Sequence, residues 1–72
     1  MNRPPALSPK EIARILEHLG YTLVRQKGSH RVYTNGTREI VVPMHSKTLK
    51  RPTQANIIKA TGLTAEEFLK HR

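Results

Sequence analysis

The chain has 72 residues and carries 13 lysines and arginines against 5 acidic residues, so its formal net charge is +8 at pH 7. A chain of this length predicts one small domain with a shallow active site, because its core is too small to surround a large cofactor. Cysteine is absent, which excludes disulfides and thiolate chemistry, and the basic charge favours a polyanionic partner such as nucleic acid over a merely solvated surface.

The N-terminal segment predicts an arm rather than part of the fold. Residues 1–7 include Pro4 and Pro5, which oppose helix formation, and they show no alternation of apolar and polar residues. We therefore expect a flexible N-terminal arm over residues 1–7 and a single domain over residues 8–72.

A first helix is predicted immediately after this arm. Ser8 and Glu11 form the Ser-x-x-Glu capping box that marks the start of a helix, and Pro9 suits the first helical position. Apolar residues then recur at helical spacing and form one stripe: Ile12, Ile15, Leu16 and Leu19. Gly20 is expected to end the helix as a left-handed cap.

The middle of the chain predicts three antiparallel strands, over residues 21–27, 30–34 and 38–42. Gly28 and Ser29 turn the chain between the first two strands. Asn35-Gly36 is a strong signal for a two-residue hairpin turn between the last two, because both residues tolerate positive φ. The core is expected to be aliphatic and to include Leu16, Leu23, Val32, Ile40, Val42 and Ile57.

The C-terminal part predicts a basic loop and two helices. The loop covers residues 44–51, a second helix follows over residues 52–61, and a Thr64–Glu67 capping box starts a short last helix over residues 65–71. The predicted fold class is α+β, a two-layer sandwich in the order α-β-β-β-α with a short extra C-terminal helix and one three-stranded antiparallel sheet. This arrangement resembles double-stranded RNA-binding domains, which recognise the shape of RNA.

Nothing in the sequence predicts attachment to a membrane. No apolar stretch approaches the roughly 18 residues that a membrane-spanning helix requires. Residues 1–9 are polar and rich in proline, which is not the pattern of a signal peptide. A cytoplasmic location is therefore expected.

His30 stands out among the four histidines because it follows a tight turn and is flanked by the cations Lys27 and Arg31. An imidazole titrates near neutral pH, so it can exchange a proton under working conditions. Strand alternation places His30 and Val32 on one face of the sheet and Arg31 and Tyr33 on the other. From these residues alone, a structural histidine and a proton-transfer residue both remain open.

The other three histidines carry weaker signals. His18 and His71 lie near the ends of predicted helices and are expected to be solvated. His45 lies in the basic loop, where a plain loop residue is favoured over a phosphate contact.

Metal binding and nucleophilic catalysis are not expected. The sequence has neither cysteine nor aspartate and no pair of histidines at metal-ligand spacing. Glu39 is the only carboxylate in a predicted strand, so a pair of catalytic carboxylates is not available there. Ser29 and His30 are adjacent in an extended chain, where their side chains point apart and form no dyad.

A longer set of residues carries a family resemblance. It comprises Gly20-Tyr21, Val24-Arg25-Gln26-Lys27-Gly28-Ser29-His30-Arg31-Val32-Tyr33, Val42-Pro43, His45, Lys47-Thr48-Leu49-Lys50 and Ala60-Thr61-Gly62-Leu63-Thr64. In these residues the chain resembles the HicA family of toxin components from bacterial and archaeal toxin–antitoxin pairs, over about Ser8 to Phe68. It departs from the family at Arg51-Pro52-Thr53, where Pro-Gly-Thr is more usual, and at Arg31, where another histidine or a hydrophobic residue is common.

The resemblance implies a ribosome-independent mRNA-cleaving toxin with a double-stranded-RNA-binding-like fold, active in the stress response. It implies that His30 is catalytic. Its expected partners are mRNA and a HicB-type antitoxin protein that covers the active site. No metal ion, small-molecule cofactor or membrane is expected.

RNA brings its own nucleophile, the ribose 2′-hydroxyl, so the protein needs only a base, a proton donor and positive charge. We expect His30 to act as base or acid, and the second proton-transfer group is left open between His45 and Tyr33. The residues expected to contact RNA are Arg25, Lys27, Gly28, Ser29, Arg31, Lys47, Lys50 and Arg51.

Two other functions fit the same residues. A non-catalytic double-stranded RNA-binding module would share the fold and the charge, and a protein-interaction domain would use its basic face on an acidic partner. A cleavage assay separates the first from a nuclease. A weak salt dependence of RNA binding would favour the second, because phosphate contacts give a steep one.

Overall fold

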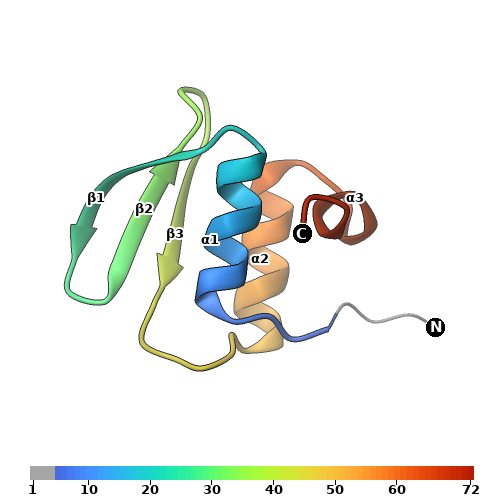
Figure 1. Ribbon diagram of the computed structural model, residues 1–72, viewed down its shortest axis with the longest axis horizontal. Coiled ribbons are helices and arrows are strands. Elements are labelled where there is room, and N and C mark those ends of the chain that lie inside the picture. Colours follow the sequence, from blue (N-terminus) through green and yellow to red (C-terminus); the bar gives the residue numbers. More distant parts are fainter. Residues whose placement is uncertain (1–4) are drawn as a thin grey trace.

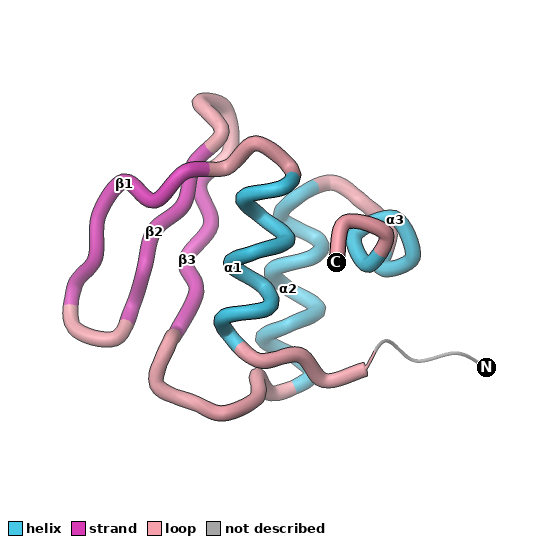
Figure 2. Tube along the Cα trace, viewed as in Figure 1, coloured by secondary structure: helices cyan, strands magenta, loops and turns pink. Residues whose placement is uncertain are grey.

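The structure, a computed structural model, describes residues 5–72. Its elements are α1 (Pro9–His18), β1 (Thr22–Lys27), β2 (His30–Thr34), β3 (Glu39–Pro43), α2 (Arg51–Thr61) and α3 (Ala65–Leu69). The strands form one antiparallel sheet in the order β1-β2-β3, and α1 and α2 both contact β3 (Figure 1 and Figure 2). The predicted α+β class and the order α-β-β-β-α are therefore confirmed.

Both capping boxes form where the sequence predicts them. Ser8 Oγ accepts a hydrogen bond from the Glu11 N–H at 3.1 Å, and Glu11 Oε1 accepts one from the Ser8 N–H at 3.0 Å. The backbone hydrogen bond from Ser8 lowers the pKa of the Glu11 carboxyl, because it stabilises the charged form. Thr64 and Glu67 build the same box at the start of α3. None of the helices described over residues 5–72 is long and apolar enough to cross a membrane.

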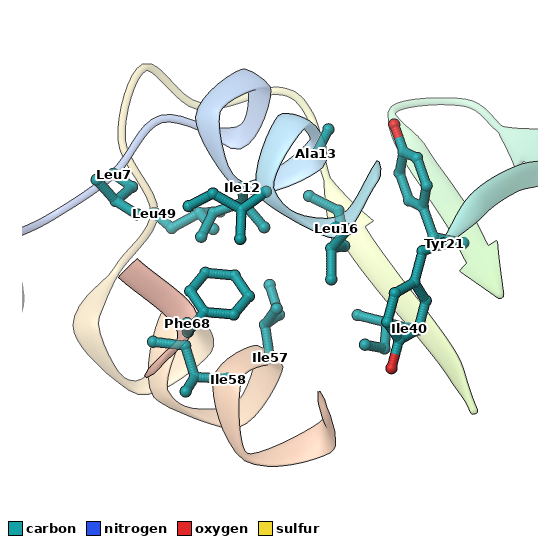
Figure 3. Packing of buried hydrophobic residues seen from close by; sticks show 13 residues of the cluster. Leu7, Ile12, Ala13, Leu16, Tyr21, Ile40, Leu49, Ile57, Ile58 and Phe68 are labelled. Atoms are coloured by element: carbon teal, nitrogen blue, oxygen red, sulfur yellow. The ribbon is translucent and has the colours of Figure 1, made fainter. Parts of the chain in front are cut away.

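One cluster of buried side chains joins all three helices to the sheet. Its members are Leu7, Ile12, Ala13, Ile15, Leu16, Tyr21, Tyr33, Ile40, Val42, Leu49, Ile57, Ile58 and Phe68. The ring of Phe68, from α3, is fully buried and lies close to Ile12, Ile57 and Ile58 (Figure 3). The short C-terminal helix is therefore part of the core, and the aromatic residues contribute to that core together with the predicted aliphatic ones.

The segment before α1 is fixed to α2. The N–H of Leu7 donates to Oε1 of Gln54 at 2.8 Å, and Nε2 of Gln54 donates to the carbonyl of Pro5 at 2.8 Å. Leu7 is 1% exposed. The prediction of a flexible arm over residues 1–7 is therefore wrong for Pro5 and Leu7, because a buried amide satisfies their backbone groups. The rest of the predicted arm, residues 1–4, lies outside the described residues.

β1 is the edge strand that lies farther from the helices. All six of its residues are exposed, and Leu23, which the sequence predicts for the core, is 45% exposed. A β-bulge between Leu23 and Arg25 makes two residues of β1 oppose Val32. The prediction for Leu23 is wrong because α1 and α2 lie against β3, at the opposite edge of the sheet (Figure 1).

The turn between β2 and β3 lies one residue later than predicted. Its two turn residues are Gly36 and Thr37, since the Asn35 N–H donates to the Arg38 carbonyl at 3.3 Å. Gly36 has a φ of +94°, and among the described residues only glycines have positive φ. Asn35 acts instead through its side chain, whose Oδ1 accepts the N–H groups of Thr37 at 2.9 Å and Arg38 at 2.7 Å.

This turn sets the register between β2 and β3. Thr34 pairs with Glu39, so β3 begins at Glu39 rather than at Arg38. At the other end of the hairpin, Pro43 pairs with His30. The loop that follows β3 therefore starts beside the first residue of β2.

Candidate active site

The turn between β1 and β2 places His30 at one end of the sheet. Gly28 and Ser29 are the two turn residues, and Gly28 has a φ of +59°, which a type II′ hairpin turn requires at its first position. A Cβ atom at Gly28 would meet no atom within 4 Å. Glycine is therefore needed at this position for its backbone angle, not for space. The predicted tight turn before His30 is confirmed.

His30 is exposed on the face of the sheet that the helices leave open. Its Cα partners are Lys27 on β1 and Pro43 on β3, and directly opposed residues of antiparallel strands share a face. Tyr33, which alternation places on the other face, is 1% exposed and belongs to the core. The predicted alternation in β2 is confirmed, and a large ligand has access to the exposed His30 side chain.

The loop after β3 brings a second imidazole to His30. The ring centroids of His30 and His45 lie 6.0 Å apart, and the ring planes are inclined by 54°. Ser29 Oγ lies 3.3 Å from His45 Nδ1, and the Met44 N–H donates to the Ser29 carbonyl at 2.6 Å. The loop leaves the sheet at the same end as the β1–β2 turn (Figure 2). These contacts tie the two imidazole-bearing segments together.

The structure distinguishes His45 from Tyr33, the two candidates for the second proton-transfer group. Tyr33 is not available for proton transfer to a ligand, because its side chain is 1% exposed and packs in the core under the helices. His45 is exposed and next to His30. A signal for this proximity exists in the sequence: His45 follows Pro43 by two residues, and antiparallel pairing brings the end of β3 to the start of β2.

The cations predicted around His30 differ in their availability. Lys27 is exposed, shares the face of His30, and has no ion pair within the part of the chain that the structure describes. The Nη2 atom of Arg25 donates to Oε1 of Glu39 at 2.9 Å, in an exposed ion pair. Arg31 lies on the other face, and its Nε donates to Oε1 of Gln26 at 3.3 Å. Lys27 is thus the cation both adjacent to His30 and unpaired.

The remaining predicted RNA contacts follow His45 along the chain. Lys47 lies in the loop, Lys50 is the N-cap residue of α2, and Arg51 is the first residue of that helix. All three are exposed. The loop is anchored by Leu49, which is 4% exposed and whose N–H donates to the Leu7 carbonyl at 2.9 Å. These three cations therefore belong to the loop and to the start of α2, not to the β1–β2 turn.

The arrangement supports proton transfer on an anionic ligand. Two imidazoles and the Ser29 hydroxyl lie on or beside one turn, and Lys27 is the residue that pairs with His30 across it. Imidazoles exchange protons near neutral pH, and an ammonium stabilises negative charge. Within residues 5–72, no three histidine or carboxylate side chains converge in a group that could hold a metal ion.

A comparison with protein families covers this whole site. The sequence model described as the HicA toxin of bacterial toxin–antitoxin systems matches residues 9–63. This segment runs from the start of α1 past the end of α2 and contains both His30 and His45. No curated protein sequence matches the chain significantly.

Proposed function

The chain belongs to the HicA family of toxins from bacterial toxin–antitoxin systems, and on this premise we propose that it is an endoribonuclease that cleaves mRNA with His30 as a proton-transfer residue. A toxin of such a pair has an antitoxin as its partner. The observation that carries the proposal is the exposed His30, which lies beside a second imidazole on the open face of the sheet.

The proposed reaction uses the nucleophile that RNA carries. A base removes the proton of a ribose 2′-hydroxyl, whose oxygen attacks the adjacent phosphorus. The bond from phosphorus to the 5′-oxygen breaks as that oxygen receives a proton. The products are a 2′,3′-cyclic phosphate and a free 5′-hydroxyl. His30 acts as the base or the acid, a role that contributes about 10²–10⁴-fold to a rate, and no metal ion is required.

Residues of the β1–β2 turn are proposed to hold the reacting phosphate. Lys27 shares the face of His30 and has no ion-pair partner among residues 5–72, so its ammonium is available to stabilise the charge that develops on phosphorus-bound oxygens. Gly28 and Ser29, the turn residues directly before His30, are proposed to contact the same phosphate.

The other cations are proposed to position the RNA backbone on either side of that phosphate. Lys47, Lys50 and Arg51 would hold the strand along the loop that leads to α2. Arg25 would reach the RNA only by leaving Glu39, and Arg31 approaches from the other face of the sheet. We therefore rank both arginines below Lys27 as contacts near the cleaved bond.

A HicB-type antitoxin is the proposed protein partner, covering the open face in the cytoplasm, where mRNA is the substrate. The large exposed hydrophobic side chains of the described chain are all in the outer strands: Leu23, Val24 and Val41, at 45%, 48% and 48% exposed. Val41 pairs with Val32 and so shares the open face with His30, and exposed apolar side chains can mark interaction sites. A partner that packs on these strands would block the approach of RNA to His30.

The proposed reaction is tested by the ends that it leaves. Incubation of the purified chain with an mRNA transcript in the presence of EDTA should yield fragments with a 2′,3′-cyclic phosphate and a 5′-hydroxyl, detected by mass spectrometry. A matched RNA with a single 2′-deoxyribose at the cleaved position should stay intact there, because it lacks the nucleophile.

Fragments that end in a 3′-hydroxyl and a 5′-phosphate would show that water, not the ribose, is the nucleophile, and would refute this reaction. Loss of cleavage in EDTA would point to a metal ion. RNA binding without any cleavage would favour the non-catalytic RNA-binding module.

A further inference from the structure

We propose that His45 is the second catalytic residue of the site, and that His30 and His45 divide the two proton transfers between them. One imidazole takes the proton of the ribose 2′-hydroxyl, and the other gives a proton to the departing 5′-oxygen. This inference rests on the proposed ribonuclease function and supplies the group that the reaction still lacks.

The separation of the two rings suits one phosphodiester. A catalytic hydrogen bond between heavy atoms is about 2.6–3.2 Å long, and the ring centroids of His30 and His45 are 6.0 Å apart. A phosphate bound against the edges of both rings could therefore contact a nitrogen of each. The attacking and the leaving oxygen are bonded to the same phosphorus, so the two transfers need two groups placed on different sides of one small anion.

Both rings are available to a ligand. His30 and His45 are exposed, and they come from two different segments, the start of β2 and the loop after β3. Lys27, on β1, is the cross-strand partner of His30. Its ammonium would complete a site with two proton-transfer groups and one fixed positive charge.

Ser29 is placed to serve His45 in both of its protonation states. Its Oγ lies 3.3 Å from Nδ1 of His45. A hydroxyl can donate to Nδ1 when the ring is neutral and accept from Nδ1–H when the ring is charged, because it is both donor and acceptor. Nε2 then remains as the atom that exchanges a proton with RNA. The Met44 N–H bond to the Ser29 carbonyl, at 2.6 Å, holds this loop on the turn.

The protons and bonds balance without any further reactant. As the bond from the 2′-oxygen to phosphorus forms, the neutral imidazole gains the hydroxyl proton. As the bond from phosphorus to the 5′-oxygen breaks, the protonated imidazole loses its proton to that oxygen. The two rings end with their protonation states exchanged and return to the start by proton exchange with water. A pair of this kind predicts a bell-shaped dependence of rate on pH.

The first arm of the test measures single-turnover cleavage of an ordinary RNA by His45→Ala and His45→Gln. We expect both variants to cleave about 10²–10⁴-fold more slowly than the wild type, with unchanged melting temperature and RNA affinity. The glutamine variant keeps a hydrogen-bonding side chain beside Ser29 but cannot transfer a proton. The variant His71→Ala, which removes an exposed histidine at the other end of the chain, is the matched control and should cleave like the wild type.

The second arm uses an RNA in which sulfur replaces the bridging 5′-oxygen at the cleaved bond. The departing thiolate needs no proton, so the variant that lacks the acid should regain a rate close to that of the wild type on this substrate. We expect rescue of one of the two variants, His30→Ala or His45→Ala, and not of the other. The rescued variant identifies the acid, and the variant that stays slow identifies the base.

The outcomes distinguish this inference from the proposed function. Cleavage by His45→Ala at the wild-type rate, with His30→Ala inactive, overturns the role of His45 and leaves the ribonuclease standing. Cleavage of ordinary RNA by His45→Gln at the wild-type rate also overturns it. So does slow cleavage of the sulfur-substituted RNA by both alanine variants. Either result assigns His45 a structural role. Absence of cleavage by the wild type defeats the proposed function itself.

Discussion

The two edge strands of the sheet, β1 and β3, have opposite surroundings. In β3, Ile40 and Val42 are at most 2% exposed and pack in the core under α1 and α2. In β1, every residue is exposed, including two large hydrophobic ones, Leu23 and Val24. The residues proposed for catalysis lie on the turn that β1 feeds and on the loop after β3, outside the core. We therefore expect substitutions that affect stability and substitutions that affect catalysis to fall on different residues of this chain.

The largest expected difference is in stability, between Ile40→Ala and Leu23→Ala. Ile40 is 2% exposed and Leu23 is 45% exposed. Removal of a buried isoleucine side chain typically costs 2–5 kcal/mol, so we expect about 2–5 kcal/mol for Ile40→Ala. For Leu23→Ala we expect a smaller loss in the free energy of unfolding, about 1 kcal/mol, because a half-exposed side chain buries less apolar surface. Urea unfolding of the two variants measures the difference, and equal losses would show that the sheet is not covered from the β3 side.

A smaller effect, on RNA binding, is expected from the ion pair that links the two edge strands. Glu39 on β3 holds Arg25 on β1 in an exposed ion pair at 2.9 Å, and such pairs add little to stability. Glu39→Gln should therefore leave the unfolding midpoint nearly unchanged but release Arg25 for RNA. We expect tighter RNA binding and a salt dependence steeper by about 0.7, the contribution of one phosphate contact on a single strand.

The control for that prediction is the double variant Arg25→Gln with Glu39→Gln, which has the same net charge as the wild type and no cation to release. It should bind RNA with the wild-type salt dependence. If Glu39→Gln and the double variant bind RNA with the same affinity and salt dependence, Arg25 does not contact RNA.

The parts of the fold that depend on local signals could be predicted from the sequence. The Ser8 and Thr64 capping boxes and the positive φ of Gly28 are determined within a few residues, and all are found in the structure. The predictions were wrong where a residue distant in the sequence determines the local structure. Gln54 fixes the backbone of Leu7 from 47 positions away, and no pattern near Leu7 indicates it.

The same distinction applies to the site. His30 could be singled out because its turn and flanking charges are adjacent in sequence. The proximity of His45 depends on the register of β3, which the Asn35 side chain shifts by closing the turn one residue later than the Asn35-Gly36 pattern predicts. The placement of Tyr33 in the core depends on which face of β2 the helices cover, and that is decided by packing.

The proposed ribonuclease function requires His30 to be an exposed proton-transfer residue that the core does not need. The most direct measurement is the single-turnover rate of RNA cleavage by His30→Ala, taken together with its melting temperature and with His71→Ala as the matched variant. We expect His30→Ala to cleave about 10²–10⁴-fold more slowly at an unchanged melting temperature, and His71→Ala to cleave at the wild-type rate. Cleavage by His30→Ala at the wild-type rate would contradict it.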